Sequence, residues 1–260
     1  MNEIENNKKT EYRAPALEKG LEILELLAAA DEPLSKKQIA EKLNRSINEI
    51  FRMLSVLVNK KYIEFDNEFS VYTLTLKMFA LSNQHPPVAL LLKNAQPLME
   101  DLSVKLNQSC HLSLYQNHEL VVISKQESPY KMGFSLRVGV SLDILGSGSG
   151  LVLLSYLSKQ DQQHILNKCE ASDEEREHAL NLSESIIKDG HFIGESPQIS
   201  GVTNISVPIF SVLGDILAIL TIPYMTLNTA TVHHHVENIE HARDELITVA
   251  EKLNHNLTKC

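Results

Sequence analysis

The chain has 260 residues, of which 43% are hydrophobic and 22% charged, so it is long enough for two domains with buried cores. No apolar run approaches the roughly 18 residues of a membrane span, and the polar N-terminus lacks the pattern of a secretion signal. We therefore expect a cytoplasmic protein with no membrane contact. The three cysteines, Cys110, Cys169 and Cys260, form no CxxC pair, which argues against a disulfide framework or a cysteine zinc site.

Positive charge is concentrated in one segment, although the formal net charge of the chain is −9. Residues 35–61 carry seven Lys and Arg side chains against two Glu, whereas residues 83–260 carry twelve basic against twenty acidic side chains. A basic patch on an acidic protein suits a local contact with nucleic acid and argues against a general attraction to it.

The N-terminal part of the chain predicts three short helices. Residues 1–14 are polar and expected to be disordered, and Pro15 is placed to begin a helix over residues 15–30. Apolar residues of that helix recur every three or four positions, at Leu17, Leu21, Leu24 and Leu27. Ser35 is placed to N-cap a second helix, which follows the break at residues 31–33. The third helix has one apolar face, formed by Ile47, Ile50, Leu54 and Leu57.

A β-hairpin is predicted directly after the third helix. Residues 62–65 and 71–74 are rich in aromatic and β-branched side chains, and they flank the polar turn 66–68. A hairpin in this place is the wing of a winged helix. The sequence therefore predicts a winged helix-turn-helix domain over residues 15–80.

The pattern of predicted helices and strands changes after Pro86 and Pro87, which we interpret as part of a linker. A linker helix is expected over residues 76–94 and a second domain over residues 95–258. That domain has predicted strands paired around Asn117 and His118, an extended run at 135–145 and a helix after the glycines at 146–150. Charged helices at 159–168 and 173–189, strands near 191–195, 203–211 and 214–223, and a helix from about Asn228 follow. Strands flanked by helices predict an α+β fold of sensor type.

The third helix carries the residues expected to read DNA. In a helix-turn-helix, one helix crosses the phosphate backbone and the next lies in the major groove with its N-terminal residues against base edges. Arg and Asn side chains at that end can address guanine and adenine, whereas lysines suit phosphates. The predicted DNA-binding residues are Lys36, Lys37, Arg45, Ser46, Asn48, Arg52 and Ser55.

Two acidic features oppose this interpretation. Glu49 faces the same side as the proposed base readers, and Glu64, Asp66 and Glu68 make the wing acidic, which disfavours phosphate contact. The alternative is that three helices and a hairpin form a small core for protein contact, with the lysines as ordinary solvated surface.

The segment Gly146-Ser147-Gly148-Ser149-Gly150 lies between an extended run and an apolar helix. Its N–H groups and hydroxyls could receive the carboxylate of a small organic acid at a helix N-terminus. Ser147 or Ser149 could instead simply cap the helix. No GK[ST] follows, so this is not a P-loop, and no cofactor is indicated. The string also fits G-x-S-x-G, so a serine hydrolase with His111 or His191 as base is a less favoured alternative.

The histidines do not predict a metal site. His233, His234 and His235 are consecutive, so on a helix they point about 100° apart and cannot converge on one ion. His234 and His241 share a helix face, but a solvated helix start explains them better. Cys110 and His111 are neighbours in a predicted strand, and neighbouring strand residues face opposite sides.

The ordered set of segments resembles one family. PALEKGLEILELL, LSKKQIAEKL, INEIFRMLSVLVNKKYIE and YTLTLKMFALS resemble the N-terminal half of IclR-type bacterial transcriptional regulators. VGVSLDILGSGSGLVLLSYL and IIKDGHFIGESPQISGVTNISVPIFSVLGDILAILTI resemble that family's effector-binding domain. The likeness covers roughly residues 15–255, and Arg52 matches the arginine of the family's recognition helix.

The resemblance implies a winged helix-turn-helix domain joined to a GAF-like α+β effector-binding domain, with no enzymatic activity. It places the effector pocket at Ser147, Gly148, Ser149, Asn204, Thr221 and Pro223. We expect a homodimer or homotetramer that binds a double-stranded DNA operator, with binding modulated by a small-molecule effector. The remaining alternative is a ligand-sensing or scaffold protein with weakened DNA binding.

Overall fold

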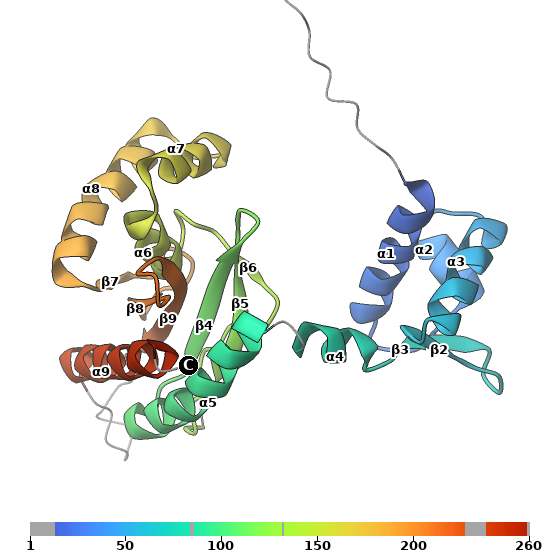
Figure 1. Ribbon diagram of the computed structural model, residues 1–260, viewed down its shortest axis with the longest axis horizontal. Coiled ribbons are helices and arrows are strands. Elements are labelled where there is room, and N and C mark those ends of the chain that lie inside the picture. The colour runs from blue at the N-terminus through green and yellow to red at the C-terminus, as the bar shows by residue number, and fades with distance from the viewer. Residues whose placement is uncertain (1–13, 84–85, 132, 227–237, 259–260) are drawn as a thin grey trace, which may run out of the picture. The chain divides into compact units, whose positions relative to one another are not determined.

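The computed structural model describes residues 14–83, 86–131, 133–226 and 238–258. The chain divides into two compact units, and the division falls between Pro86 and Pro87 (Figure 1). The expected linker region contains the end of the first unit and the start of a long helix that packs within the second unit.

The described part of the first unit consists of four helices and a small antiparallel sheet whose strand order is β1-β3-β2. In chain order its elements are α1 (Pro15–Ala28), β1 (Leu34–Ser35), α2 (Lys36–Lys42), α3 (Ile47–Asn59), β2 (Ile63–Asp66), β3 (Val71–Leu74) and α4 (Lys77–Asn83). The predicted hairpin is present, with Ile63 opposite Leu74 and Asp66 opposite Val71. Strand β1 has no counterpart among the predicted elements, and it pairs only two residues with β3.

Serine caps fix where α2 and α3 begin. Ser35 forms a capping box with Gln38, and Ser46 forms one with Glu49. Between the two helices Asn44 has a φ of 52°, a left-handed conformation that Asn tolerates better than most residues. The tight polar break seen in the sequence is therefore a turn through Asn44, closed at both sides by hydrogen bonds.

The core of the first unit is formed by aliphatic side chains from all three predicted helices and the wing: Ile23, Ile39, Ile50, Leu54 and Ile63. The apolar stripe of α1 is only partly used, because Leu17 is 63% exposed and Leu21 is 49% exposed. Periodicity predicted the helix and the buried Leu27 correctly, but it missed Ile23, which is fully buried.

The second unit is a six-stranded antiparallel sheet, ordered β6-β5-β4-β9-β8-β7, with helices on both faces. Its elements are α5 (Pro86–Leu106), β4 (Cys110–Gln116), β5 (Glu119–Gln126), β6 (Ser141–Leu142), α6 (Gly148–Tyr156), α7 (Lys159–Lys168), α8 (Asp173–Asp189), β7 (Phe192–Glu195), β8 (Val202–Phe210), β9 (Ile216–Met225) and α9 (Ile239–Thr258). The extended run predicted at 135–145 forms a strand only at Ser141–Leu142. The predicted start of the last helix at Asn228 lies outside the described residues.

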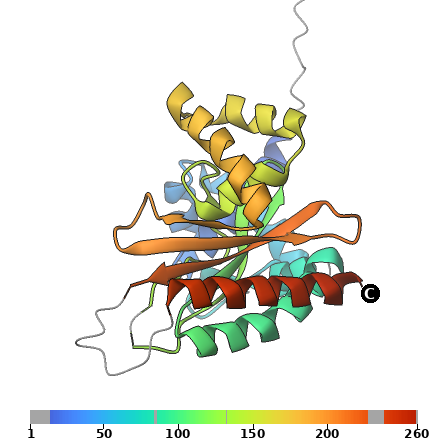
Figure 2. The same cartoon turned by 90° about the vertical axis from the view of Figure 1, so that its left-hand side faces the viewer.

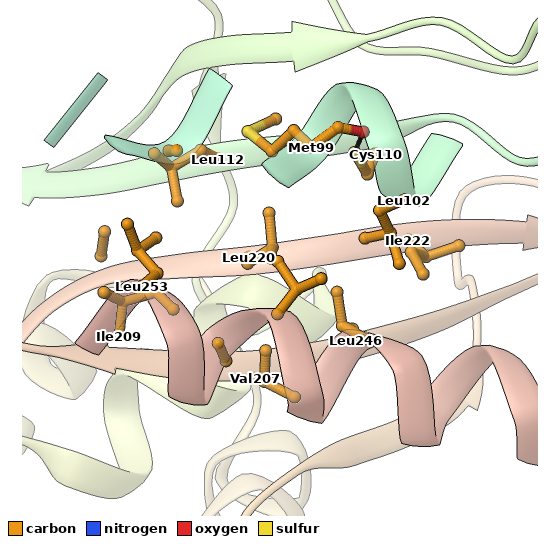
Figure 3. Close-up of a cluster of buried hydrophobic side chains, with 14 of the residues drawn as sticks. Met99, Leu102, Cys110, Leu112, Val207, Ile209, Leu220, Ile222, Leu246 and Leu253 are labelled. Atoms are coloured by element: carbon orange, nitrogen blue, oxygen red, sulfur yellow. Dashed lines mark hydrogen bonds between the residues drawn. The ribbon is translucent and has the colours of Figure 1, made fainter. Parts of the chain in front are cut away.

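Two apolar layers hold this sheet. Helices α5 and α9 cover one face, and α6 and α8 lie against the other (Figure 2). Leu246 and Leu253 of α9 pack beside strand residues such as Leu220 (Figure 3). Strand β4 alternates accordingly, since Cys110 and Leu112 face the α5–α9 layer and His111 faces α6. The expected fold class, a winged helix-turn-helix followed by an α+β domain, is confirmed.

Candidate functional site

The exposed face of α3 presents Asn48 and Arg52 to solvent. In the described part of the chain neither side chain has a hydrogen bond or an ion pair. The Lys36 ammonium lies 5.0 Å from the centre of the Phe51 ring, and Phe51 is 52% exposed. Lys37 is loosely paired with Glu41, at 3.8 Å between strongly exposed side chains. This surface of α2 and α3 has positive charge and free amide and guanidinium donors, from Lys36, Lys37, Asn48 and Arg52.

Three other predicted DNA-binding residues have partners inside the domain. Nη2 of Arg45 lies 3.1 Å from a carboxylate oxygen of Glu22 on α1. The Ser46 hydroxyl accepts from the backbone N–H of Glu49 as the N-cap of α3. The Ser55 hydroxyl donates to the Phe51 carbonyl, at 2.9 Å. In the free protein these groups serve the domain's own structure.

Glu49 is tied into the domain instead of standing free among the base readers. Its carboxylate accepts a hydrogen bond from the Lys19 ammonium at 2.6 Å and from the Ser46 hydroxyl at 2.8 Å. The bond from Lys19, followed by the bonds from Ser46, lowers the pKa of Glu49 from 4.5 to about 2. Its charge is therefore largely compensated, which reduces the repulsion that the sequence suggested.

The acidic wing also uses part of its charge internally. Asp66 accepts hydrogen bonds from the backbone N–H groups of Glu68 and Phe69, at 2.8 and 3.1 Å, so it holds the turn of the hairpin. Glu64 accepts from the Thr73 hydroxyl at 3.2 Å. The wing still presents negative charge, so we expect no phosphate contact from these three acidic residues.

A small pocket of about 40 Å³ lies in the second unit, where the N-terminus of α6 meets the sheet. All six residues expected to form the effector pocket line it: Ser147, Gly148, Ser149, Asn204, Thr221 and Pro223. They come from α6, β8 and β9, and they are joined by residues such as His111 of β4 and Phe134. Segments far apart in sequence thus converge on one point.

Two glycines at the start of α6 let the helix pack closely against the sheet and against the segment before it. A Cβ at Gly148 would lie 2.9 Å from Asn204 and Phe192 side-chain carbons, and a Cβ at Gly150 would overlap the backbone of Ile144. Ser147, just before them, is the N-cap of α6 and accepts from the N–H of Gly150 at 3.1 Å. The alternative that a serine caps this helix is therefore correct for Ser147, and it does not conflict with a pocket at the same place.

Hydroxyl groups form a buried chain on the pocket floor. The oxygens of Ser149 and Thr221 are 2.8 Å apart, and Thr221 donates to Ser206, also at 2.8 Å. His111 Nε2 lies 3.4 Å from the Ser149 hydroxyl. Ser206 was missed from the sequence, although it lies two residues after Asn204 on the same strand face and opposite Thr221.

His111 is the titratable group of this floor. Burial lowers its pKa from 6.5 to about 4, because the charged imidazolium loses its hydration. The ring is therefore neutral near pH 7. Its Nδ1 has no hydrogen-bond partner among the described residues. The other residues that line the small pocket are all uncharged.

A larger cavity of about 830 Å³ lies on the other side of residues 146–148. Asp143, Glu170, Glu175 and Glu195 are among its lining residues, and none of the described residues that line it is a Lys or Arg. An acidic wall of this kind repels anions. The larger cavity is therefore a poor site for an anion.

The geometry does not support a hydrolase. Ser149 contacts His111, but its hydroxyl also bonds to Thr221, and no described carboxylate bonds to His111 Nδ1 to orient the ring. Metal binding is not supported in the described residues either, where no group of three His, Cys, Asp or Glu converges. Cys110 and His111 face opposite sides of the sheet, and His233 to His235 lie outside the described residues.

Two family models match the chain: the IclR helix-turn-helix domain over residues 16–67, and the bacterial transcriptional regulator IclR C-terminal domain over residues 88–254. This chain belongs to the IclR family of regulators. Among curated IclR-type relatives, the transcriptional regulator KdgR of Dickeya chrysanthemi is 23% identical over 76% of this chain and 67% of its own length. KdgR of Escherichia coli K12 is 24% identical over 73% of this chain and 74% of its own length.

Solved IclR structures share the fold. An IclR homologue from Microbacterium hydrocarbonoxydans, solved with 4-hydroxybenzoate, has a TM-score of 0.80 at 18% identity and covers 94% of this chain and all of its own. The regulator from Alicyclobacillus acidocaldarius has a TM-score of 0.73 at 18% identity, covering 95% of this chain and all of its own.

These comparisons establish the chain as an IclR-family DNA-binding transcriptional regulator with a C-terminal effector-binding domain. Because the relatives are regulators and not enzymes, the expectation of no enzymatic activity is confirmed. Among the described helices, none is long and apolar enough to span a membrane.

Proposed function

We propose that this IclR-family regulator binds a double-stranded operator through α3, and that a small organic acid in the pocket beside α6 changes that binding. The observation that carries the proposal is the convergence of three polar segments on one neutral pocket at a helix N-terminus. Partial positive charge at that end of α6 favours a carboxylate. The effector acts only if it binds two arrangements of the protein with different affinity.

In this proposal the exposed residues of α3 divide into two roles. Arg52 and Asn48 contact base edges, because their donors are free and solvent-exposed. Lys36 and Lys37 contact phosphates. Arg45 contributes after it leaves Glu22, whereas Ser46 and Ser55 contribute mainly by shaping the helix.

Operator binding is tested by fluorescence anisotropy with genomic fragments from around this gene, over a range of salt concentrations. The logarithm of the association constant should fall linearly with the logarithm of salt concentration. Arg52→Ala should lower specific affinity by about tenfold to hundredfold, in line with the loss of one bidentate base contact. Arg45→Ala should cost less, because Glu22 competes for the guanidinium.

Lys188→Ala is the matched control for charge, since it removes an exposed positive side chain from α8 of the second unit. It should leave operator affinity unchanged. Specific binding that survives both Arg52→Ala and Arg45→Ala would show that α3 is not the reading helix. If the protein binds acids but no DNA, the ligand-sensing alternative replaces the regulator.

Effector binding is tested by thermal shift against a panel of small carboxylic, aromatic and sugar acids. A ligand at 100 times its dissociation constant adds about 2.7 kcal/mol to stability. Ser147→Ala and Asn204→Ala should weaken that shift, whereas Ser185→Ala on the exposed side of α8 should not. Equal shifts in all three variants would place the acid elsewhere.

We also propose a homodimer or homotetramer. Leu17 and Leu21 expose 63% and 49% of their surface on one face of α1, and a second copy could cover this stripe. A symmetric assembly requires an operator with two-fold related half-sites. Analytical ultracentrifugation of the full chain and of Leu21→Glu tests this, with a monomeric wild type as the contrary result.

A further inference from the structure

The pocket floor contains a hydrogen-bond chain whose direction can be derived. Thr221 Oγ1 donates its hydrogen to Ser206 Oγ at 2.8 Å. A threonine hydroxyl has only one hydrogen, so the 2.8 Å contact between Ser149 and Thr221 must use the Ser149 hydrogen. Ser149 therefore has no hydrogen left for His111.

The histidine tautomer follows from this count. Across the 3.4 Å contact, Ser149 Oγ can only accept, so the hydrogen lies on His111 Nε2. A neutral imidazole carries one N–H, which leaves Nδ1 as a bare acceptor. His111 lines the pocket and is only 3% exposed, and its Nδ1 has no partner among the described residues, so this lone pair is buried and unpaired.

We propose that the effector of this pocket is a hydroxylated acid, whose hydroxyl donates a hydrogen bond to Nδ1 of His111. This inference rests on the proposed function, because it concerns the same pocket and the same class of ligand. A carboxylate or a keto oxygen cannot fill this position, since neither carries a hydrogen to donate at neutral pH. In this arrangement the carboxylate of the same ligand binds at the N-terminus of α6.

The charged groups near His111 are bonded to other partners, so none of them pairs with its neutral ring. Lys125 of β5 is paired in register with His111 and faces the same side of the sheet, but it is bonded to Glu127 at 2.6 Å and to Ser135 at 3.3 Å. Asp143, before α6, accepts the N–H groups of Leu145 and Gly146. Each nearby charge thus has its own partner.

The first test uses matched acids that differ at one group: lactate, propionate and pyruvate, and 4-hydroxybenzoate with benzoate. Isothermal titration calorimetry with the full chain should show tighter binding of the hydroxylated member of the series that enters the pocket. We expect the affinity of the hydroxylated acid to be about tenfold to hundredfold higher than that of its partner, which is the usual cost of leaving a buried polar group unpaired. The preference should be equal at pH 6 and pH 8, because no proton is taken up.

Three variants and one control locate the effect. His111→Phe should abolish the preference, whereas His111→Asn should retain part of it, because the amide oxygen can stand near the place of Nδ1. Exposed His255→Asn is the control and should change nothing. Thr221→Val frees the Ser149 hydrogen for Nε2, which moves the histidine hydrogen to Nδ1, so the preference should shift toward pyruvate.

A second measurement examines the tautomer without any ligand. A two-dimensional ¹H–¹⁵N spectrum of the histidine rings, with the His111 signals assigned through His111→Phe, reports which ring nitrogen carries the hydrogen. Hydrogen on Nδ1 would overturn the inference, as would equal affinity within each matched set. A His111-dependent loss of about tenfold in affinity per pH unit would also overturn it, because the ring would then bind as imidazolium.

Different results would refute the proposed acid site and the proposed role of His111. If none of the acids binds at any concentration up to about 10 mM, the pocket is not an acid site, and both proposals fall. If hydroxylated and plain acids bind equally and Ser147→Ala weakens both, the acid site stands and only the role of His111 is refuted.

Discussion

Replacement of Gly150 by alanine should destabilise the second unit. A Cβ there would overlap the backbone of Ile144, with 2.6 Å to its carbonyl carbon, whereas ordinary contacts begin at 3.4 Å. Both sides of the overlap are backbone, so no side chain can rotate away, and α6 must move by roughly 1 Å. Overpacking costs about 1–3 kcal/mol, and contacts that are all backbone place this case at the upper end, whereas alanine returns up to about 1 kcal/mol through helix propensity. We expect a net loss of about 2 kcal/mol.

Thermal unfolding followed by circular dichroism measures this loss. For a unit of this size, about 2 kcal/mol lowers Tm by roughly 4–8 °C. Gly20→Ala is the matched control, because it lies inside α1 and its Cβ would meet nothing within 4 Å. That change should leave the first unit equally or more stable. A Gly150→Ala protein as stable as the wild type would refute the inferred contact between α6 and the segment before it.

Three further results are expected. Ser46→Ala removes the capping box of α3 and should cost about 1 kcal/mol in urea unfolding of the first unit, with unchanged stability as the contrary result. Because the folded pKa of Glu49 is lowered to about 2, its contribution is complete above pH 4.5 and lost as the pH falls toward 2; acid titration of Glu49→Gln should show a smaller fall over that range. Leu246→Ala opens a cavity between α9 and the sheet and should cost about 2–5 kcal/mol, whereas exposed Leu180→Ala on α8 should cost little.

Local rules predicted the elements well where one short motif decides the structure. Ser35 precedes a helix because its hydroxyl accepts the free N–H of Gln38, and that geometry needs no tertiary contact. The run at 135–145 was predicted to be extended, but only Ser141 and Leu142 pair with β5. Strand pairing depends on a distant partner, which alternation within one segment does not reveal.

For the site residues too, short motifs in the sequence were informative, whereas contacts with distant segments were not. The resemblance and the glycine pattern predicted six residues that line one pocket, and the structure adds His111 of β4 to that lining. It also shows Ser206 of β8, which accepts a hydrogen bond from Thr221. Whether those residues bind an effector stays a prediction. On the DNA side, charge counting could not show that Arg45 and Glu49 are held by Glu22 and Lys19, because both partners lie on α1, more than twenty residues earlier.

If the proposed acid binds in the small pocket, the pocket also limits how fast the protein can respond to it. Its volume of about 40 Å³ holds a few water molecules but not an organic acid, so the walls must separate before a ligand enters. The observed association rate should then level off at high ligand concentration, at the rate of opening. The apparent affinity is weakened in proportion to the rarity of the open form. The opening of the pocket, and not ligand diffusion, then sets the response time. A change that loosens residues 196–199 should shorten that time.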